Sequence, residues 1–321
     1  MNNENQVLLT EKYRPKFLSG VVGQTSVIRR IKAYVKVGRI PHLLLSGAPG
    51  TGKSTTALCI ARELFGSGWQ LNFLEINSSD ERGINTIREK VKEFVETAGS
   101  FTGKDSKWDG KILLLDEVDS MTKDAQNALR RIMEIYSNNC SFILTCNNIG
   151  HVIEPIISRC QVYRFSHLNN EEILNRLTYI MKIEKLNYSS TELEAIIFCS
   201  DGDLRKAINL LEVCENQGIE GIYRLNGIIT NEKTIMIIAY ALSGDFYKSV
   251  ITIEKLLLEG YSGRDILRSV MRTVEGMDIS EMIKASIIAH IGETEYRICS
   301  GGDELIQLKA FLASLVLIGS K

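Results

Sequence analysis

The stretch SGAPGTGKSTTALC, residues 46–59, places three glycines, one lysine and several hydroxyl side chains between an apolar run and a helical pattern. Gly47, Gly52, Lys53 and Ser54 fit the spacing G-x-x-x-x-G-K-[ST]. Glycines at these positions let successive backbone N–H groups point inward, and the helix that follows presents its N-terminal dipole to an anion. The stretch therefore predicts a cradle for the phosphates of a nucleoside triphosphate.

Two side chains of this loop have expected roles. Lys53 is expected to reach the β and γ phosphates, and Ser54 is expected to ligate Mg²⁺. The alternative, a glycine-rich turn that only caps a helix, is disfavoured because a strand-like and a helical segment flank the loop. The predicted nucleotide contacts in the loop are Gly47, Ala48, Pro49, Gly50, Thr51, Gly52, Lys53, Ser54 and Thr55.

A pair of adjacent carboxylates, Asp116 and Glu117, follows the apolar run ILLL. Asp116 would hold Mg²⁺ directly or through water, and Glu117 would orient and polarise the attacking water as a general base. Ligands bind at the carboxyl ends of parallel strands, so this pair and the phosphate cradle should project to the same side of a sheet. A solvated acidic loop is the alternative. Beside the cradle, the pair favours nucleotide hydrolysis.

These motifs need a sheet to position them, and the first half of the chain predicts one. Near-continuous apolar runs with helical patterns between them are typical of buried parallel strands covered on both faces. After Phe165 the remaining sequence is helical, and Asn169 with Glu172 three residues later marks the first helix start. We predict domains at 1–166, 167–229 and 230–321. The predicted strands are 42–46, 71–76, 111–116, 141–146 and 161–165.

Composition limits the function further. The chain of 321 residues is 44% hydrophobic with a net charge of -1, so any nucleic-acid contact must come from local patches rather than from overall basicity. The polar start MNNENQ and the lack of an apolar run of about 20 residues predict an intracellular protein without membrane association. Seven cysteines without a C-x-x-C pair favour reduced thiols over disulfides or zinc ligands.

The sequence resembles a known family over essentially its whole length. EKYRP (11–15), GAPGTGKST, LLLDEVDSMTKDAQNALRRIMEIYSNN, TCNN, VIEPIISRC and GDLRKAINLL follow one another as in the small subunits of replication factor C. That protein is the eukaryotic sliding-clamp loader of the AAA+ ATPase class. MEIYSNN, LEAIIF and LEGYSGRDILRSV look most like one particular small subunit.

The resemblance implies a fold, an activity and partners. The fold would be an α/β AAA+ P-loop ATPase domain, an αβα sandwich with a five-stranded parallel sheet, followed by a helical lid and an all-α collar. With ATP and Mg²⁺, the chain would work with four other subunits in a heteropentamer. This complex would open the sliding clamp and load it at primer–template DNA in the nucleus.

The resemblance also implies roles for single residues. Asn147 matches the first sensor of the γ-phosphate or the lytic water, and Arg205 matches the second sensor, carried by the lid. Asp203 would cap the helix that carries Arg205. The segment that closes over adenine is matched by Tyr13, Arg14, Pro15 and Val22.

Arg159, in the motif SRC, matches an arginine that does not serve its own nucleotide. In the family it projects into the neighbouring subunit's site as an arginine finger and stabilises charge on the transferring phosphoryl group. The alternative is a surface arginine after a turn. If the family role holds, function requires a ring or arc of subunits.

DNA contact is expected from two helices, largely because of the resemblance. Arg82 follows cap candidates at one helix start, and Lys123, Arg130 and Arg131 belong to the next such element, which also carries Gln126. Contacts of this kind follow the phosphate backbone and carry no base specificity. For each charge taken singly, a solvated helix face is the alternative.

Two apolar stripes are candidate interfaces. The helix from about residue 86 to 97 shows Ile87, Val91, Phe94 and Val95 on one face, mostly for core packing, with one exposed member as a possible contact to the sliding clamp. The last helix is expected to offer an interlocking surface to other subunits. Its stripe comprises Leu305, Leu308, Phe311, Leu312 and Leu315.

The sequence departs from the family pattern in two places. Val118 stands where relatives commonly have alanine, and we expect the packing to adjust while catalysis survives. The SSD stretch at 78–80 leaves Asn77 as the candidate for the residue that switches Glu117 between idle and active states. Two alternatives stay open: a scaffold that binds nucleotide without turnover, and another AAA+ remodeller such as a helicase.

Overall fold

The computed structural model describes residues 8–78, 84–96, 106–215 and 217–320. The chain divides into two compact units, and each is described by itself. The first comprises Met1–Asn187 and Ile196–Val213, and the second comprises Tyr188–Ala195 and Cys214–Lys321. The three-domain division at residues 166 and 229 stays a prediction.

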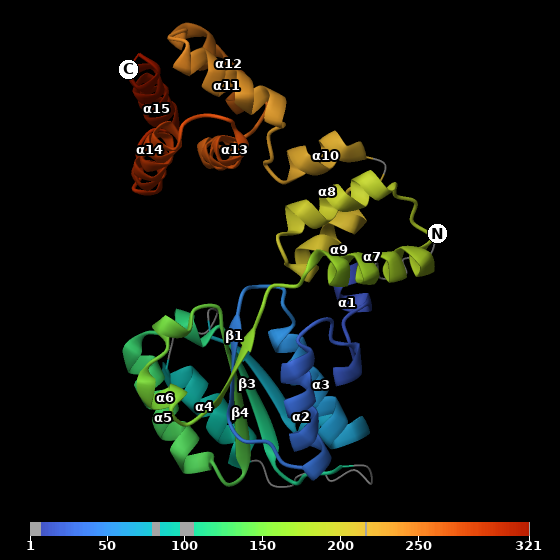
Figure 1. The fold of residues 1–321 in the computed structure, drawn as a ribbon. Helices are drawn as coiled ribbons and strands as arrows, with labels where there is room; N and C mark the ends of the chain where they lie inside the picture. The colour runs from blue at the N-terminus through green and yellow to red at the C-terminus, as the bar shows by residue number, and fades with distance from the viewer. Residues whose placement is uncertain (1–7, 79–83, 97–105, 216, 321) are drawn as a thin grey trace, which may run out of the picture. The chain divides into compact units, whose positions relative to one another are not determined.

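The first unit contains the predicted sheet of five parallel strands (Figure 1). The strand order is β2-β3-β4-β1-β5. Each strand begins and ends within two residues of its predicted run, so the expected α/β architecture is confirmed. The strands are β1 (Leu43–Gly47), β2 (Phe73–Asn77), β3 (Lys111–Asp116), β4 (Cys140–Cys146) and β5 (Gln161–Phe165).

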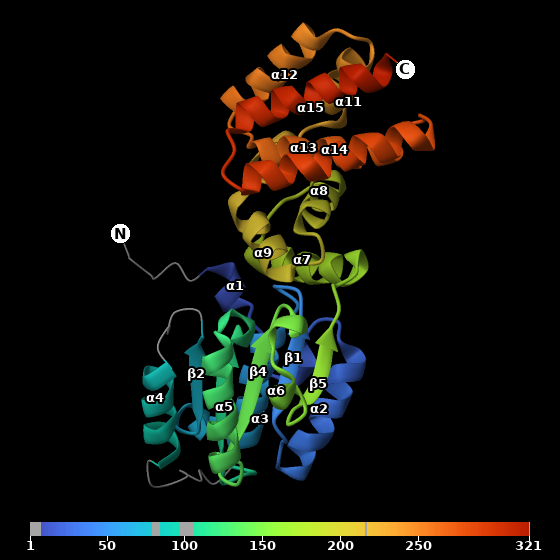
Figure 2. The ribbon, with the colours of Figure 1, turned by 90° about the vertical axis from the view of Figure 1, so that its left-hand side faces the viewer.

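Helices cover both faces of this sheet (Figure 1, Figure 2). Successive strand residues face opposite sides of the sheet. Leu43 and Leu45 of β1 pack in the core on one face, whereas Leu44 packs in the core on the other face. Each fully buried leucine stabilises such a core by about 1.5–3 kcal/mol. One face carries α2 (Thr25–Val37) and α3 (Lys53–Phe65), and the other carries α4 (Ile84–Glu96), α5 (Lys123–Tyr136) and α6 (Glu154–Ile157).

The strand order brings the chemically important strand ends together. In the central pairs, Leu115 of β3 lies opposite Leu144 of β4, and Ser46 of β1 lies opposite Cys146. The loop after β1 and the residues after β3 and β4 therefore meet at one edge of the sheet, where ligands bind in open parallel sheets.

Two helices of the first unit beyond the sheet have the predicted caps. Asn169 Oδ1 accepts from Glu172 N at 2.8 Å, and Glu172 Oε2 accepts from Asn169 N at 3.0 Å, so the predicted start is confirmed. Asp203 Oδ1 accepts from Lys206 N at 2.9 Å, as expected for the cap of the helix that carries Arg205. The helices of the first unit beyond the sheet are α1 (Leu9–Lys12), α7 (Asn170–Glu184) and α9 (Leu204–Val213). The helix α8 (Ser190–Ser200) divides between the two units.

The second unit is helical (Figure 2), and its apolar core is built mainly by the five helices from residue 231 onward. Among the described residues, no helix combines the length and the apolar character needed to cross a bilayer. The helices are α10 (Gly218–Leu225), α11 (Asn231–Leu242), α12 (Phe246–Leu258), α13 (Gly263–Gly276), α14 (Glu281–Cys299) and α15 (Glu304–Gly319).

The apolar stripe of α15 corrects one prediction. Leu308, Phe311, Leu312 and Leu315 are buried against α11, α12, α13 and α14 in the core of their own unit. Leu305 is half-buried. A stripe that covers its own core has no apolar surface left for a neighbour, so the expected interlocking surface is wrong for these four residues.

Candidate active site

The loop between β1 and α3 adopts the backbone that its glycines were expected to allow. Gly50 and Gly52 have positive φ angles of 66° and 100°, a region that residues with a Cβ atom rarely occupy. A Cβ atom added at Gly50 would lie only 1.6 Å from Asp203 Oδ1. Glycine at position 50 is therefore required both by the turn and by the close approach of the α9 cap.

Lys53, the first residue of α3, is held at the centre of the loop. Its Nζ donates to the carbonyl oxygens of Gly47 at 2.7 Å and Ala48 at 2.9 Å, and to Asn147 Oδ1 at 3.0 Å. Burial lowers the pKa of this amine, and the nearby Asp116 carboxylate partly opposes that effect. An ammonium group with three neutral acceptors can exchange them for phosphate oxygens, which offer stronger, charge-assisted hydrogen bonds.

Ser54 and Asp116 form the candidate metal site. Ser54 Oγ lies 2.9 Å from Asp116 Oδ2 and 3.1 Å from Oδ1. A hydroxyl beside a carboxylate supplies the hard oxygen ligands that Mg²⁺ takes in phosphate sites. The donor chemistry and the short distance between the two side chains therefore fit a magnesium ion held with bound phosphates.

Thr145, near the end of β4, orients both acidic residues. Its Oγ1 donates a hydrogen bond to Asp116 Oδ1 and accepts one from Glu117 N at 3.1 Å. Thr145 was not among the predicted site residues. The signal that could have found it is a hydroxyl two residues before Asn147 on the strand next to β3, but strand adjacency was not known from the sequence.

Glu117 has a left-handed backbone with φ of +58°. Such a conformation costs a non-glycine residue about 1–3 kcal/mol and is found where surrounding contacts impose it. Next to it, Val118 is fully buried in the core, so the residue that departs from the family pattern is accommodated by packing. Asp119 Oδ2 accepts from the backbone N atoms of Asn147 and Asn148 at 3.0 and 2.9 Å, which fixes the end of β4.

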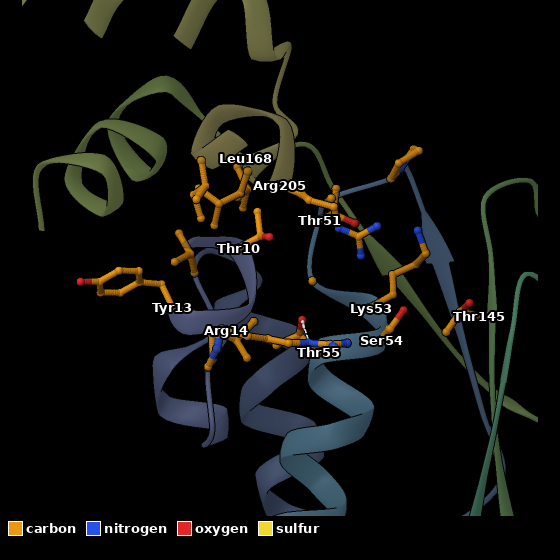
Figure 3. Close-up of a pocket in the computed structure, with 18 of the residues that line it drawn as sticks. Thr10, Tyr13, Arg14, Thr51, Lys53, Ser54, Thr55, Thr145, Leu168 and Arg205 are labelled. Atoms are coloured by element: carbon orange, nitrogen blue, oxygen red, sulfur yellow. Dashed lines mark hydrogen bonds between the residues drawn. The ribbon is translucent and has the colours of Figure 1, made fainter. Parts of the chain in front are cut away.

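A cavity joins these groups (Figure 3). The empty space between its walls has a volume of about 1040 Å³, which includes open solvent at its mouth. The described lining contains Asp116, Glu117, Asn147, Arg205 and the segment 49–55, and also the predicted base-closing residues Tyr13, Arg14, Pro15 and Val22. Gly47 and Ala48 do not line it; their carbonyls hold Lys53 instead. Lining residues that the sequence analysis missed include Thr10, Glu11, Val21, Thr145, Leu168 and Arg176.

Arg159 does not line this cavity. Its Nη1 donates to Pro155 O at 2.7 Å, and its Nη2 lies 2.5 Å from Glu134 Oε1 of α5. Both members of this ion pair are exposed to solvent, with 37% and 43% of their side-chain surfaces accessible. The side chain is therefore placed where a neighbouring molecule can reach it, and its role in trans stays a prediction.

The residues predicted to contact DNA are only partly described. Lys123 and Arg131 are exposed on α5, and Arg130 is half-buried. Within the described residues, Arg130 Nε is buried without a hydrogen-bond partner. Arg82 lies outside the described residues, as do Ser79 and Asp80.

Gln126 is structural, whereas the clamp contact expected from one member of the α4 stripe stays a prediction. Gln126 is buried; its Nε2 donates to His151 O at 2.9 Å, and its Oε1 accepts from Ile153 N at 2.8 Å. It thereby ties α5 to the segment that leads to Arg159. On α4, Val91 is buried and the half-buried Phe94 and Val95 pack on the same core, while Ile87 lies outside the described side chains. Asn77 ends β2.

Together these groups fit the chemistry of phosphoryl transfer to water. The loop and Lys53 can bind phosphates, Ser54 and Asp116 can hold a divalent cation, and Glu117 faces the same cavity as a candidate base. Arg205 is a further cation that reaches the cavity, from α9.

Comparisons with known proteins agree with this geometry. Residues 43–168 match the ATPase family associated with various cellular activities (AAA), and residues 229–314 match the replication factor C C-terminal domain. The replication factor C small subunit of Sulfurisphaera tokodaii is 43% identical over 100% of this chain and 98% of its own length. The Archaeoglobus fulgidus protein of the same name is 44% identical over 99% of this chain and 100% of its own.

A solved structure supports the fold alone. The Thermotoga maritima RuvB Holliday junction branch migration motor aligns with a TM-score of 0.54 at 18% identity, covering 71% of this chain and 78% of that one.

Proposed function

The chain belongs to the family of replication factor C small subunits, and from this premise we propose that it is an ATP-hydrolysing subunit of a sliding-clamp loader. The observation that carries the proposal is the convergence of Lys53, Ser54, Asp116 and Glu117 on one cavity. A subunit that only scaffolds an assembly has no need of a candidate base in that position, so a scaffold without turnover is disfavoured.

The residues of the site divide the reaction between them. Lys53 binds the β and γ phosphates, and the N-terminus of α3 adds backbone N–H groups to the same end. Ser54 and Asp116 would hold a magnesium ion, which when bound would neutralise charge on the phosphate oxygens. Glu117 accepts the proton of the attacking water, and Asn147 helps to position that water or the γ phosphate. Arg205 contributes a further positive charge from α9.

Further parts of the proposal concern the assembly. We place the chain in a heteropentamer with four other subunits in the nucleus, where ATP binding favours opening of the sliding clamp and grip on primer–template DNA. Lys123, Arg130, Arg131 and Arg82 would contact the DNA backbone. Among eukaryotic relatives, the chain would correspond to the small subunit numbered 2 in humans and 4 in budding yeast. The resemblance of particular sequence stretches supports this assignment.

Arg159 tests the assembly most sharply. In the proposal it completes the neighbour's site, where a finger supplied in trans is worth roughly 10³ to 10⁵ in rate. In a reconstituted complex in which only the adjacent subunit keeps its base, Arg159→Ala should disable single-turnover hydrolysis at the adjacent site. A second complex, in which only this subunit keeps its base, reports on the chain's own site. This subunit's own site should remain active. If only the site built by Lys53 of the same chain loses hydrolysis, the assignment in trans is wrong.

The clamp-loading function itself is tested with primed circular DNA and the sliding clamp of the same organism. The complex should deposit closed clamps on this DNA with ATP, and the complex carrying Lys53→Ala should not. Deposition of clamps at the same rate without ATP, or no deposition by the intact complex, would contradict the proposed function.

A further inference from the structure

The N-terminal arm, residues 9–18, is held by two different parts of the first unit. Up to Tyr13, its polar contacts with the rest of the unit go to α7 and α9; from Arg14 onward they go to α3. The change occurs at the peptide bond between Tyr13 and Arg14, and both residues line the cavity. The arm therefore bridges the helix of the phosphate loop and the helix that carries Arg205.

The α3 side of the bridge is short and polar. Arg14 Nε donates to Thr55 Oγ1 at 3.3 Å, the contact marked in Figure 3. Leu18 N donates to Glu63 Oε1 at 2.6 Å. These bonds fix the second half of the arm to the same helix that begins at Lys53, so this half follows the phosphate loop.

The first half of the arm converges on one carboxylate. The Tyr13 hydroxyl donates to Glu184 Oε1 at the end of α7, and Lys12 Nζ lies 2.7 Å from the same oxygen. Hydrogen bonds from Lys12 and Tyr13 lower the pKa of Glu184, so its carboxylate is charged at neutral pH. Leu9 N adds a bond of 3.2 Å to Glu212 Oε2 of α9.

Arg176, one of the lining residues that the sequence analysis missed, holds the backbone at the same point. Its Nη2 donates to the carbonyl oxygen of Tyr13 at 2.5 Å. Its guanidinium also lies 5.2 Å from the centre of the Tyr179 ring, and that ring meets Tyr13 edge-on at 6.3 Å. Both the side chain and the main chain of Tyr13 are therefore fixed by α7, while the Tyr13 ring points away from Lys53 (Figure 3).

We propose that Arg176 and Glu184 are positioning residues for the ATP site, which hold Tyr13 so that the arm stays closed over the base end of the nucleotide. The inference rests on the proposed function, because the family resemblance is what places Tyr13 beside adenine. The phosphates are held independently by the β1–α3 loop. Loss of either positioning residue should therefore loosen the base end and leave the phosphate end intact.

The experiment compares two ligands on the full chain. Arg176→Ala, Glu184→Ala and Tyr13→Phe should each raise the dissociation rate of ATP about tenfold, because a hydrogen bond to a charged group is worth roughly that factor. The affinity for inorganic tripolyphosphate with Mg²⁺, which has no base, should stay unchanged. Glu171→Gln on the same helix and Tyr179→Phe, which keeps its ring, are matched controls and should release ATP at the wild-type rate.

A double-mutant cycle separates positioning from general damage. Arg176→Ala combined with Tyr13→Phe should release ATP more slowly than the product of the two single effects predicts, because both act on one residue. Wild-type ATP dissociation in all three variants would overturn the inference. A parallel loss of tripolyphosphate affinity would also overturn it, because the whole site would then be disturbed. If the wild-type chain bound tripolyphosphate but not ATP, the proposed function itself would fail.

Discussion

Lys53 Nζ and Asn147 Oδ1 are 3.0 Å apart, so the start of α3 and the residue that follows β4 are joined directly in the wall of the cavity. The contact places an amide within reach of the phosphates that Lys53 would bind. It also gives Asn147 a partner before any nucleotide arrives, which keeps its side chain in position.

Asn147→Ala should therefore slow hydrolysis more than it weakens ATP binding. Removal of one preorganised polar group from a transition state costs about 10²–10³ in rate, whereas Lys53 keeps its other two partners. Single-turnover kinetics of the assembled complex and ATP titration of the isolated chain measure the two effects. Asn148→Ala, whose side chain caps a short turn by accepting from Gly150 N, is the neighbouring control. Equal losses of binding and rate for Asn147→Ala would argue against a sensor.

Thr145→Val keeps the shape of the side chain but removes the hydroxyl that joins Asp116 to the backbone of Glu117. Outer partners of a metal site are worth about 10–100-fold in metal affinity or activity, so the Mg²⁺ concentration needed for half-maximal turnover should rise by that order. Ser141→Ala serves as the control, because its hydroxyl lies at the other end of β4 and bonds to Ile40 O. An unchanged Mg²⁺ requirement in Thr145→Val would count against this role.

The lowered pKa of Lys53 predicts a pH dependence of ATP binding. Burial moves the pKa below the ordinary value of about 10.4, and bound phosphates favour the charged amine and raise it again. Binding therefore takes up a proton wherever free Lys53 is neutral, and ATP affinity should fall as pH rises toward the ordinary lysine pKa. Calorimetry in two buffers of different ionisation enthalpy would show the proton uptake.

Lys53→Arg provides the control for this dependence. A guanidinium stays charged above pH 12, so ATP affinity of this variant, whatever its absolute size, should stay constant over the same range. A decline of the same slope in both proteins would show that another group titrates.

Much of this site was predictable because its chemistry is local in sequence. The lysine, the serine and the carboxylate pair lie within short motifs, and five apolar runs were enough to predict five parallel strands. The order of those strands is not local, and for that reason the contact from Thr145 to Asp116 could not be anticipated. Arg176 was missed for the same reason, since a single arginine on a helix gives no sign of the cavity it lines.

The stripe on α15 shows a different limit. Its spacing correctly predicted an apolar helix face, but periodicity does not specify what covers that face. In the structure Leu308 and Phe311 face helices of their own unit. The same spacing is equally typical of a core position, and the burial of these side chains decides between the two.

The exposed positions of Lys123 and Arg131 on α5 give a prediction for DNA. If each contacts a phosphate, replacement by alanine should weaken binding by the assembled complex equally for all sequences. It should also reduce the salt dependence by roughly one ion-equivalent per contact. Fluorescence anisotropy over a salt series measures both, with Arg297→Ala, an exposed arginine of α14, as the control. A loss confined to one DNA sequence would contradict a backbone contact.

The central claim, that this chain's own site binds ATP and hydrolyses it with Glu117 as base, is tested most directly by comparing two variants. Lys53→Ala removes the charge that faces the phosphates, whereas Glu117→Gln keeps the size of the side chain and loses only the proton acceptor. With radiolabelled ATP and the isolated chain, Lys53→Ala should retain no nucleotide, and Glu117→Gln should bind ATP. In the complex with the other subunits' bases silenced, the wild-type chain should cleave ATP, and Glu117→Gln should leave it uncleaved. Hydrolysis by Glu117→Gln at the wild-type rate, or failure of the folded variant to bind ATP, would contradict the account.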